Sequence, residues 1–122
     1  MNTAVLLLLA LSTKHFIIDF LLQYPYQYLN KGTYGHPGGL MHASLHAVGT
    51  AISLALCGLF DLIWVLSAAD AVIHYHIDWA KMNLNKHYGW ACNTSDKFWT
   101  LIGLDQYLHM LTYLAIAYIV TQ

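Results

Sequence analysis

The sequence contains no glutamate and no arginine, and charged residues make up only 9% of its 122 positions. Soluble proteins carry roughly 25% charged residues, so the charged surface of a soluble helical protein is missing here. Hydrophobic residues account for 58% of the chain, above the roughly 45–50% that is usual for soluble domains. Both deviations favour a chain that inserts into a membrane.

Basic clusters and paired cysteines are also absent. The net charge is −1 and the five lysines are scattered, so the sequence offers no basic surface and nucleic acid is excluded as a partner. Cys57 and Cys92 lack a CxxC spacing and are expected to be small core residues. No internal repeat or low-complexity segment divides the chain, so we expect one domain over residues 1–122.

Four long apolar segments are present. The first lacks a positively charged start and a small-residue cleavage site, so it is predicted to be a membrane helix and not a cleaved signal. Two prolines and four glycines between residues 24 and 39 predict a loop, and residues 85–97 predict another. The predicted fold is all-α, a polytopic four-helix transmembrane bundle with helices over residues 3–22, 40–59, 62–83 and 98–120.

Every predicted helix carries ionisable residues four positions apart, in the stretches HFIID, HASLH, DAVIHYHID and DQYLH. This spacing places the side chains on one stripe of each helix. In an up-and-down bundle, the four stripes reach the same depth. Each ionisable side chain at a helix centre costs about 2.5–3.5 kcal/mol on insertion, so these groups must pair or bind a cation. The candidates are His15, Asp19, His42, His46, Asp70, His74, Asp78, Asp105 and His109.

Neutral imidazoles and carboxylates are metal ligands, and the i, i+4 spacing lets two side chains of one helix converge on one ion. Nine candidates exceed one coordination shell, so either two ions are bridged or some members orient the ligands. The expected cofactor is a divalent transition metal, zinc first, with manganese or iron as alternatives. A hydrogen-bonded network between helices, without metal, is the competing interpretation. His76 points away from the stripe and is excluded from the set.

Four further roles follow from position. Asp78 is the predicted general base, and Lys81, three residues later, is placed to meet developing negative charge. Gln23 extends the stripe of the first helix and Lys31 lies in the following loop, so both are candidate substrate-binding residues. All five lysines fall in the polar half of the bundle, which therefore faces the cytoplasm by the positive-inside rule.

The motifs HFIIDFLLQ, HASLH, DAVIHYHIDWAK and DQYLH together resemble a family of short membrane proteins of bacteria and phages known as a domain of unknown function. The resemblance extends from His15 to His109. The chain is also distantly similar to inner-membrane metal-dependent hydrolases, which carry His-based motifs at helix ends. These resemblances imply a metal site and an inner-membrane location.

The leading functional hypothesis is a membrane-embedded metal-dependent hydrolase that acts on a lipid-linked or amphipathic substrate, with a phosphoester as one option. Its expected partners are membrane lipid and that substrate, and homo-oligomer formation stays open. The alternatives are a non-catalytic metal-binding or transport protein and a di-iron membrane oxidase. The oxidase ranks lower because no HxxHH element is present, and interleaved carboxylates also disfavour haem.

Overall fold

A computed structural model describes residues 1–122. The protein is all-α without strands, as predicted. Its elements are α1 (Thr3–Phe16), a π-helix η1 (Ile17–Leu21) that continues α1, the short α2 (Pro25–Tyr28), α3 (Pro37–Leu56), α4 (Ile63–Tyr88) and α5 (Asp96–Val120).

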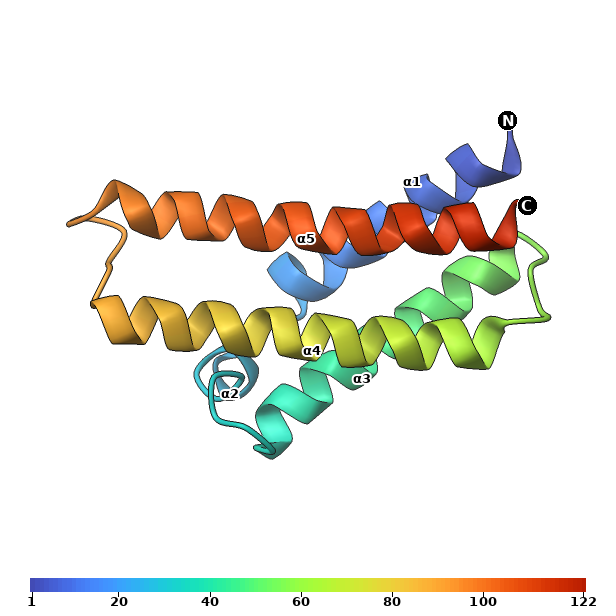
Figure 1. The fold of residues 1–122 in the computed structure, drawn as a ribbon. Helices are drawn as coiled ribbons and strands as arrows, with labels where there is room; N and C mark the ends of the chain where they lie inside the picture. Colours follow the sequence, from blue (N-terminus) through green and yellow to red (C-terminus); the bar gives the residue numbers. More distant parts are fainter.

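The long helices close into a ring, with α1 against α3 and α5, α3 against α4, and α4 against α5 (Figure 1). The antiparallel pair α4 and α5 lies side by side, and both chain termini lie at the same end as the link between α3 and α4 (Figure 1). The opposite end of α4 and α5 extends beyond the end of η1 (Figure 1). The ring therefore surrounds an interior to which every long helix contributes.

The helix boundaries differ from the predicted ones for local reasons. The second helix begins at Pro37, not residue 40, because proline is tolerated at the first helical position and His36 Nδ1 accepts a hydrogen bond from the Gly38 N–H at 3.0 Å. It ends at Leu56, three residues before the predicted end. The third helix continues past residue 83 to Tyr88 and stops where Gly89 adopts a left-handed φ of 65°.

The first predicted helix is regular only to Phe16, after which the π-helix Ile17–Leu21 follows. A π turn has no simple sequence signal, and such turns are frequent at functional sites. Asp19 lies within this turn. The irregularity therefore coincides with one of the predicted ligands.

Apolar residues pack together at the end of the bundle near the termini. We call this set the apolar core, and its members are Leu7, Leu11, Leu54, Leu66, Tyr113, Ile116 and Ala117. Helix α1 and its continuation η1 approach α3 closely at Gly49, where an added Cβ would lie 2.9 Å from Ile18 Cδ1 and 3.1 Å from Lys14 Cδ. The apolar core fixes how the four helices meet.

Outside the apolar core the interior is mainly polar, and many large apolar side chains point outward. The buried residues include fifteen polar or charged side chains and eleven hydrophobic ones. Large apolar side chains point outward instead, including Trp64, Leu56 and Leu29, each more than two-thirds exposed. Two helical segments, Thr3–Leu21 and Pro37–Leu56, are long and apolar enough to cross a membrane. Buried charged groups together with exposed large apolar side chains are unusual in a soluble domain.

The lysines divide into two groups. Lys14, Lys31 and Lys81 form ion pairs with aspartates in the interior, whereas Lys86 and Lys97 are exposed. The positive-inside rule concerns charges in loops near the helix ends. Only the two exposed lysines can therefore contribute to the orientation that the sequence predicted.

Candidate metal centre

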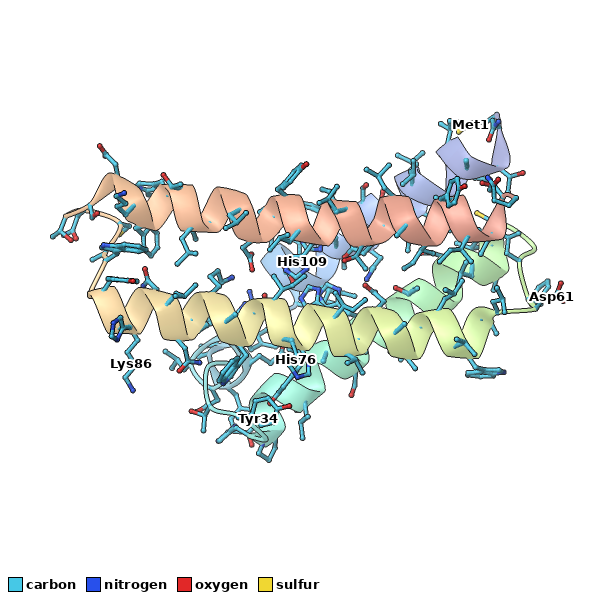
Figure 2. All side chains as sticks on the ribbon, in the orientation of Figure 1. Met1, Tyr34, Asp61, His76, Lys86 and His109 are labelled. Atoms are coloured by element: carbon cyan, nitrogen blue, oxygen red, sulfur yellow. The ribbon has the colours of Figure 1, made fainter.

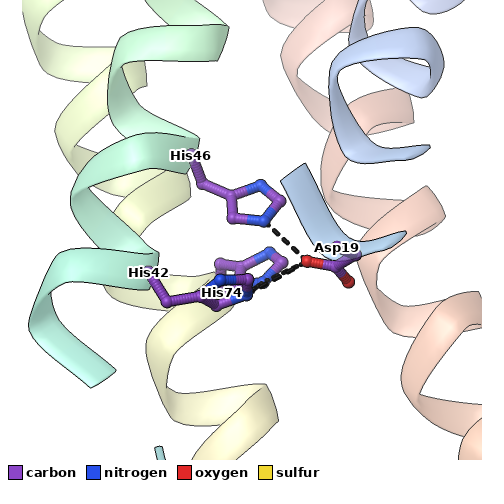
Figure 3. A group of neighbouring side chains, drawn as sticks. All are labelled: Asp19, His42, His46 and His74. Atoms are coloured by element: carbon purple, nitrogen blue, oxygen red, sulfur yellow. Dashed lines mark hydrogen bonds and ion pairs between the residues drawn. The ribbon is translucent and has the colours of Figure 1, made fainter. Parts of the chain in front are cut away.

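Asp19 is the point at which three imidazoles meet. Its Oδ1 atom lies 3.0 Å from His42 Nε2, 2.8 Å from His46 Nε2 and 3.6 Å from His74 Nε2 (Figure 3). The π turn carries Asp19, one face of α3 carries His42 and His46, and α4 carries His74. All four side chains are buried. These donor atoms lie close enough together to hold one metal ion.

Asp78 is a second point of convergence, one helical turn after His74. Its Oδ2 atom lies 3.3 Å from both His42 Nε2 and His74 Nε2, and 3.1 Å from Lys31 Nζ. Its Oδ1 atom lies 3.3 Å from His109 Nε2 of α5. His74, Asp78 and His109 form a second set that could hold an ion. We call the union of the two sets, Asp19, His42, His46, His74, Asp78 and His109, the His/Asp cluster. Figure 2 shows His109 at the middle of the interior.

Two imidazoles of the cluster face Asp19 with Nε2 and contact a further buried residue with Nδ1. The sequence did not predict either of these Nδ1 contacts. His42 Nδ1 lies 3.1 Å from Gln27 Oε1, and His46 Nδ1 lies 3.0 Å from Lys14 Nζ. Gln27 and Lys14 are themselves buried. Such contacts fix ring orientation and tautomer in metal sites. Lys14 precedes the predicted ligand His15 in sequence, whereas no motif indicated Gln27.

His15 lies beside the cluster, with both nitrogens occupied by other partners. Its Nδ1 is 2.7 Å from the Tyr113 hydroxyl, and its Nε2 is 2.9 Å from Gln106 Oε1 and 3.2 Å from Asp19 Oδ2. Gln106 Nε2 donates to Asp105 Oδ2 at 3.0 Å, which directs the Gln106 carbonyl oxygen toward His15. His15 belongs to neither set of convergent donors. Its contacts position Asp19 within the site.

Asp70 and Asp105 are buried but also lie outside those two sets. Asp70 Oδ2 is 2.7 Å from Lys14 Nζ and accepts a hydrogen bond from the Thr50 hydroxyl. Asp105 Oδ2 is 3.1 Å from Lys81 Nζ. Asp105 Oδ1 has no hydrogen-bond partner, although His109 Nε2 approaches it at 3.4 Å.

The two predicted substrate-binding residues lie in different surroundings. Lys31 is buried and its ammonium group contacts Asp78 Oδ2. Gln23 is partly buried, and its Nε2 donates to the Asp19 carbonyl oxygen at 2.8 Å. His76 is exposed and contacts Tyr34 at 2.9 Å, outside the cluster. Figure 2 shows His76 and Tyr34 away from His109.

The interior carries an excess of negative charge when its imidazoles are neutral. Four carboxylates, those of Asp19, Asp70, Asp78 and Asp105, face three ammonium groups, those of Lys14, Lys31 and Lys81. Uncompensated buried charge is costly, so a cation is favoured in this region. Imidazole and carboxylate donors match zinc, manganese and iron in type. The His/Asp cluster is therefore chemically suited to a divalent metal ion.

No curated protein and no solved structure gave a significant match to this chain. One family matches residues 5–122, and its description is "Protein of unknown function (DUF3307)". The match spans nearly the whole chain and includes all six residues of the His/Asp cluster. The protein therefore belongs to the DUF3307 family of unknown function.

Proposed function

We propose that this protein is a membrane-embedded metal-dependent hydrolase acting on a lipid-linked or amphipathic substrate. The observation that carries the proposal is the convergence of imidazole and carboxylate donors in a buried interior beside an apolar groove. A bound divalent ion polarises a phosphoryl or acyl oxygen and lowers the pKa of bound water to about 7. Zinc is the proposed ion, with manganese or iron as alternatives.

In this proposal, all four long helices cross the membrane. Helices α4 and α5 carry more charged residues than α1 and α3, but Asp70, Asp78 and Asp105 point inward and are at most 2% exposed. The outward side chains of α4 and α5 include Trp64, Val65, Leu104, Leu111 and Leu114, all at least 40% exposed. Lipid can cover such a surface, whereas water contact with it is unfavourable.

A groove between α4 and α5 gives the substrate a route from the lipid. Its volume is about 430 Å³, and its only charged lining residues are Lys81 and Asp105. The rest of the lining is mainly apolar and includes Val72, Ile73, Ile77, Ala80, Leu84 and Leu108. An acyl or prenyl chain fits these walls, while Lys81 can contact the negative charge of a phosphoester.

Asp105 replaces Asp78 as the general base in our proposal. The two oxygens of Asp78 face three imidazoles and two ammonium groups. Asp105 Oδ1 has no hydrogen-bond partner, and Asp105 lines the groove. A carboxylate oxygen that lacks a hydrogen-bond partner and lies next to the substrate route is better placed to accept a proton from water.

The test is turnover by the metal-loaded protein in lipid vesicles that contain lipid-linked phosphoesters. We expect Asp105→Asn to lower turnover by about 10²- to 10⁴-fold, the usual contribution of a general base, without lowering metal content. Asp96→Asn is the matched control, because Asp96 is exposed in the first turn of the same helix. Retained turnover in Asp105→Asn would exclude Asp105 as the base.

Non-catalytic metal binding is the second candidate function, and the enclosure of the cluster favours it. His42, His74 and Asp78 are each 1% exposed, and closed coordination is typical of structural metal sites. If the wild-type protein holds its ion but turns over none of the lipid-linked substrates, this second function replaces the hydrolase.

A further inference from the structure

We propose that the centre holds one four-coordinate divalent ion, bound by Asp19, His42, His74 and Asp78, and that His46 is not a ligand. His46 instead donates a hydrogen bond to Asp19, and Lys14 fixes it in this role. The inference rests on the metal centre of the proposed function and specifies which side chains make it. It separates the four ligands from His46, although all five residues are buried and all were candidate ligands by their i, i+4 spacing. Four protein ligands close a tetrahedral site, so hydrolysis requires that the water enter as a fifth ligand.

The tautomer of His46 follows from its contact with Lys14. An ammonium group has only donors, and Lys14 is held as an ammonium by Asp70 Oδ2 at 2.7 Å. His46 Nδ1, 3.0 Å from Lys14 Nζ, must therefore accept. The ring proton then resides on Nε2, which donates to Asp19 Oδ1 at 2.8 Å. A protonated nitrogen has no lone pair for a metal.

His42 has the opposite arrangement. Its Nδ1 donates to Gln27 Oε1 at 3.1 Å, and the Gln27 amide nitrogen contacts Met41 Sδ instead. The Nε2 lone pair of His42 is therefore free to bind a cation. His74 Nε2 lies only 3.3 Å from His42 Nε2, and its Nδ1 has no partner that would force the proton onto Nε2. Two imidazole nitrogens facing each other in this way are well placed to share one cation.

Five of the six separations among the four proposed donor atoms are close to the edges of a tetrahedral site. In a regular tetrahedron the edge is about 1.63 times the centre-to-corner distance, so zinc-ligand distances of about 2.0–2.2 Å predict edges of roughly 3.3–3.6 Å. The edges from Asp19 Oδ1 to His42 and His74 Nε2 are 3.0 and 3.6 Å. Both edges from Asp78 Oδ2 to these nitrogens, and the edge between the two nitrogens, are 3.3 Å.

A second ion beside the first is disfavoured, because a lysine already occupies that position. The remaining convergent oxygens are Asp78 Oδ1 and Asp105 Oδ1, near His109 Nε2. Lys81 Nζ lies 3.7 Å from Asp78 Oδ1 and 3.1 Å from Asp105 Oδ2. Its ammonium group supplies the positive charge that a second ion would bring, and it would repel one. We therefore expect one ion per chain.

The test compares His42 and His46, which lie one turn apart on α3 and both contact Asp19 Oδ1. The full chain in detergent is loaded with Zn²⁺, and metal per chain is measured by mass spectrometry. We expect one ion in the wild type and none in His42→Ala or His42→Gln. His46→Ala should keep the ion with about 10- to 100-fold weaker affinity, as for lost orienting contacts. His46→Gln retains an N–H donor and should recover part of that affinity.

Circular dichroism and gel filtration establish that each variant is folded, and Co²⁺ loading gives a second readout. The intense visible absorption of four-coordinate Co²⁺ should persist in His46→Gln and disappear in His42→Gln. Loss of the ion from both His46 variants, or two ions in the wild type, would overturn the proposed ligand set while leaving the hydrolase possible. A loaded wild type without turnover would overturn the hydrolase alone, and a wild type that binds no metal would overturn both.

Discussion

Two regions of the interior, the apolar core and the His/Asp cluster, are assembled by different physical interactions. The apolar core, near the termini, depends on shape and buried area, and its members need no specific partner. In the His/Asp cluster, each side chain has named partners at defined distances. Tyr113 joins the two regions, because its ring lies in the apolar core and its hydroxyl contacts His15. The apolar core can supply stability, whereas the His/Asp cluster holds the ionisable groups on which the proposed function depends.

The largest expected effect comes from breaking the buried ion pair between Lys14 and Asp70. Asp70→Leu should lower the free energy of unfolding by about 3–5 kcal/mol, because it leaves a buried ammonium group without its counter-ion. Chemical unfolding in mixed micelles measures this change. The double variant Lys14→Met/Asp70→Leu should recover most of the loss, and strictly additive losses would show that the pair is not coupled.

A cavity in the apolar core should affect stability without affecting the cluster. Leu54 is fully buried on α3, so Leu54→Ala should lower the free energy of unfolding by about 3 kcal/mol. Leu56→Ala, on the same helix but 74% exposed, is the matched control and should change little. Metal content should be unaltered in both. Loss of metal from Leu54→Ala would mean that the two regions are not independent.

The smallest expected effect tests the close approach of α1 and α3. Gly49→Ala places a methyl group 2.9 Å from Ile18 Cδ1, and we expect a loss of about 1–2 kcal/mol from overpacking. Gly103→Ala, on α5, meets no atom within 4 Å and should be neutral or stabilising by up to about 1 kcal/mol. Equal effects of the two variants would show that α1 can move freely away from α3.

The comparison also shows what sequence can predict in such a protein. Helical periodicity and the i, i+4 spacing identified the all-α class and placed ionisable residues on inward stripes, because both are local properties of the chain. Contacts such as those of Gln27 with His42 and Tyr113 with His15 depend on which helices become neighbours. The π turn at Asp19 and the continuation of α4 to Tyr88 also had no sufficient local signal.

The same limit explains why spacing could not separate ligands from their supports. His42 and His46 are equivalent in the motif HASLH, yet one faces an amide oxygen and the other an ammonium group. Lys31 was predicted to bind substrate from its place in a loop, and its contact with Asp78 could not be predicted from the sequence. Asp70, on the same stripe as His74, is held by Lys14 of another helix. Partner identity is a tertiary property, and only the folded chain reveals it.

Metal analysis of the purified protein tests the central claim most directly. We would measure transition metals per chain by inductively coupled plasma mass spectrometry in the wild type, His74→Ala and His76→Ala, all purified without chelators. His74 is buried within the cluster and His76, two residues later, is exposed. The account predicts one tightly held ion in the wild type and His76→Ala, and none in His74→Ala. A wild type without metal that also fails to take up added Zn²⁺ would contradict the account and make the His/Asp cluster a hydrogen-bonded network between helices.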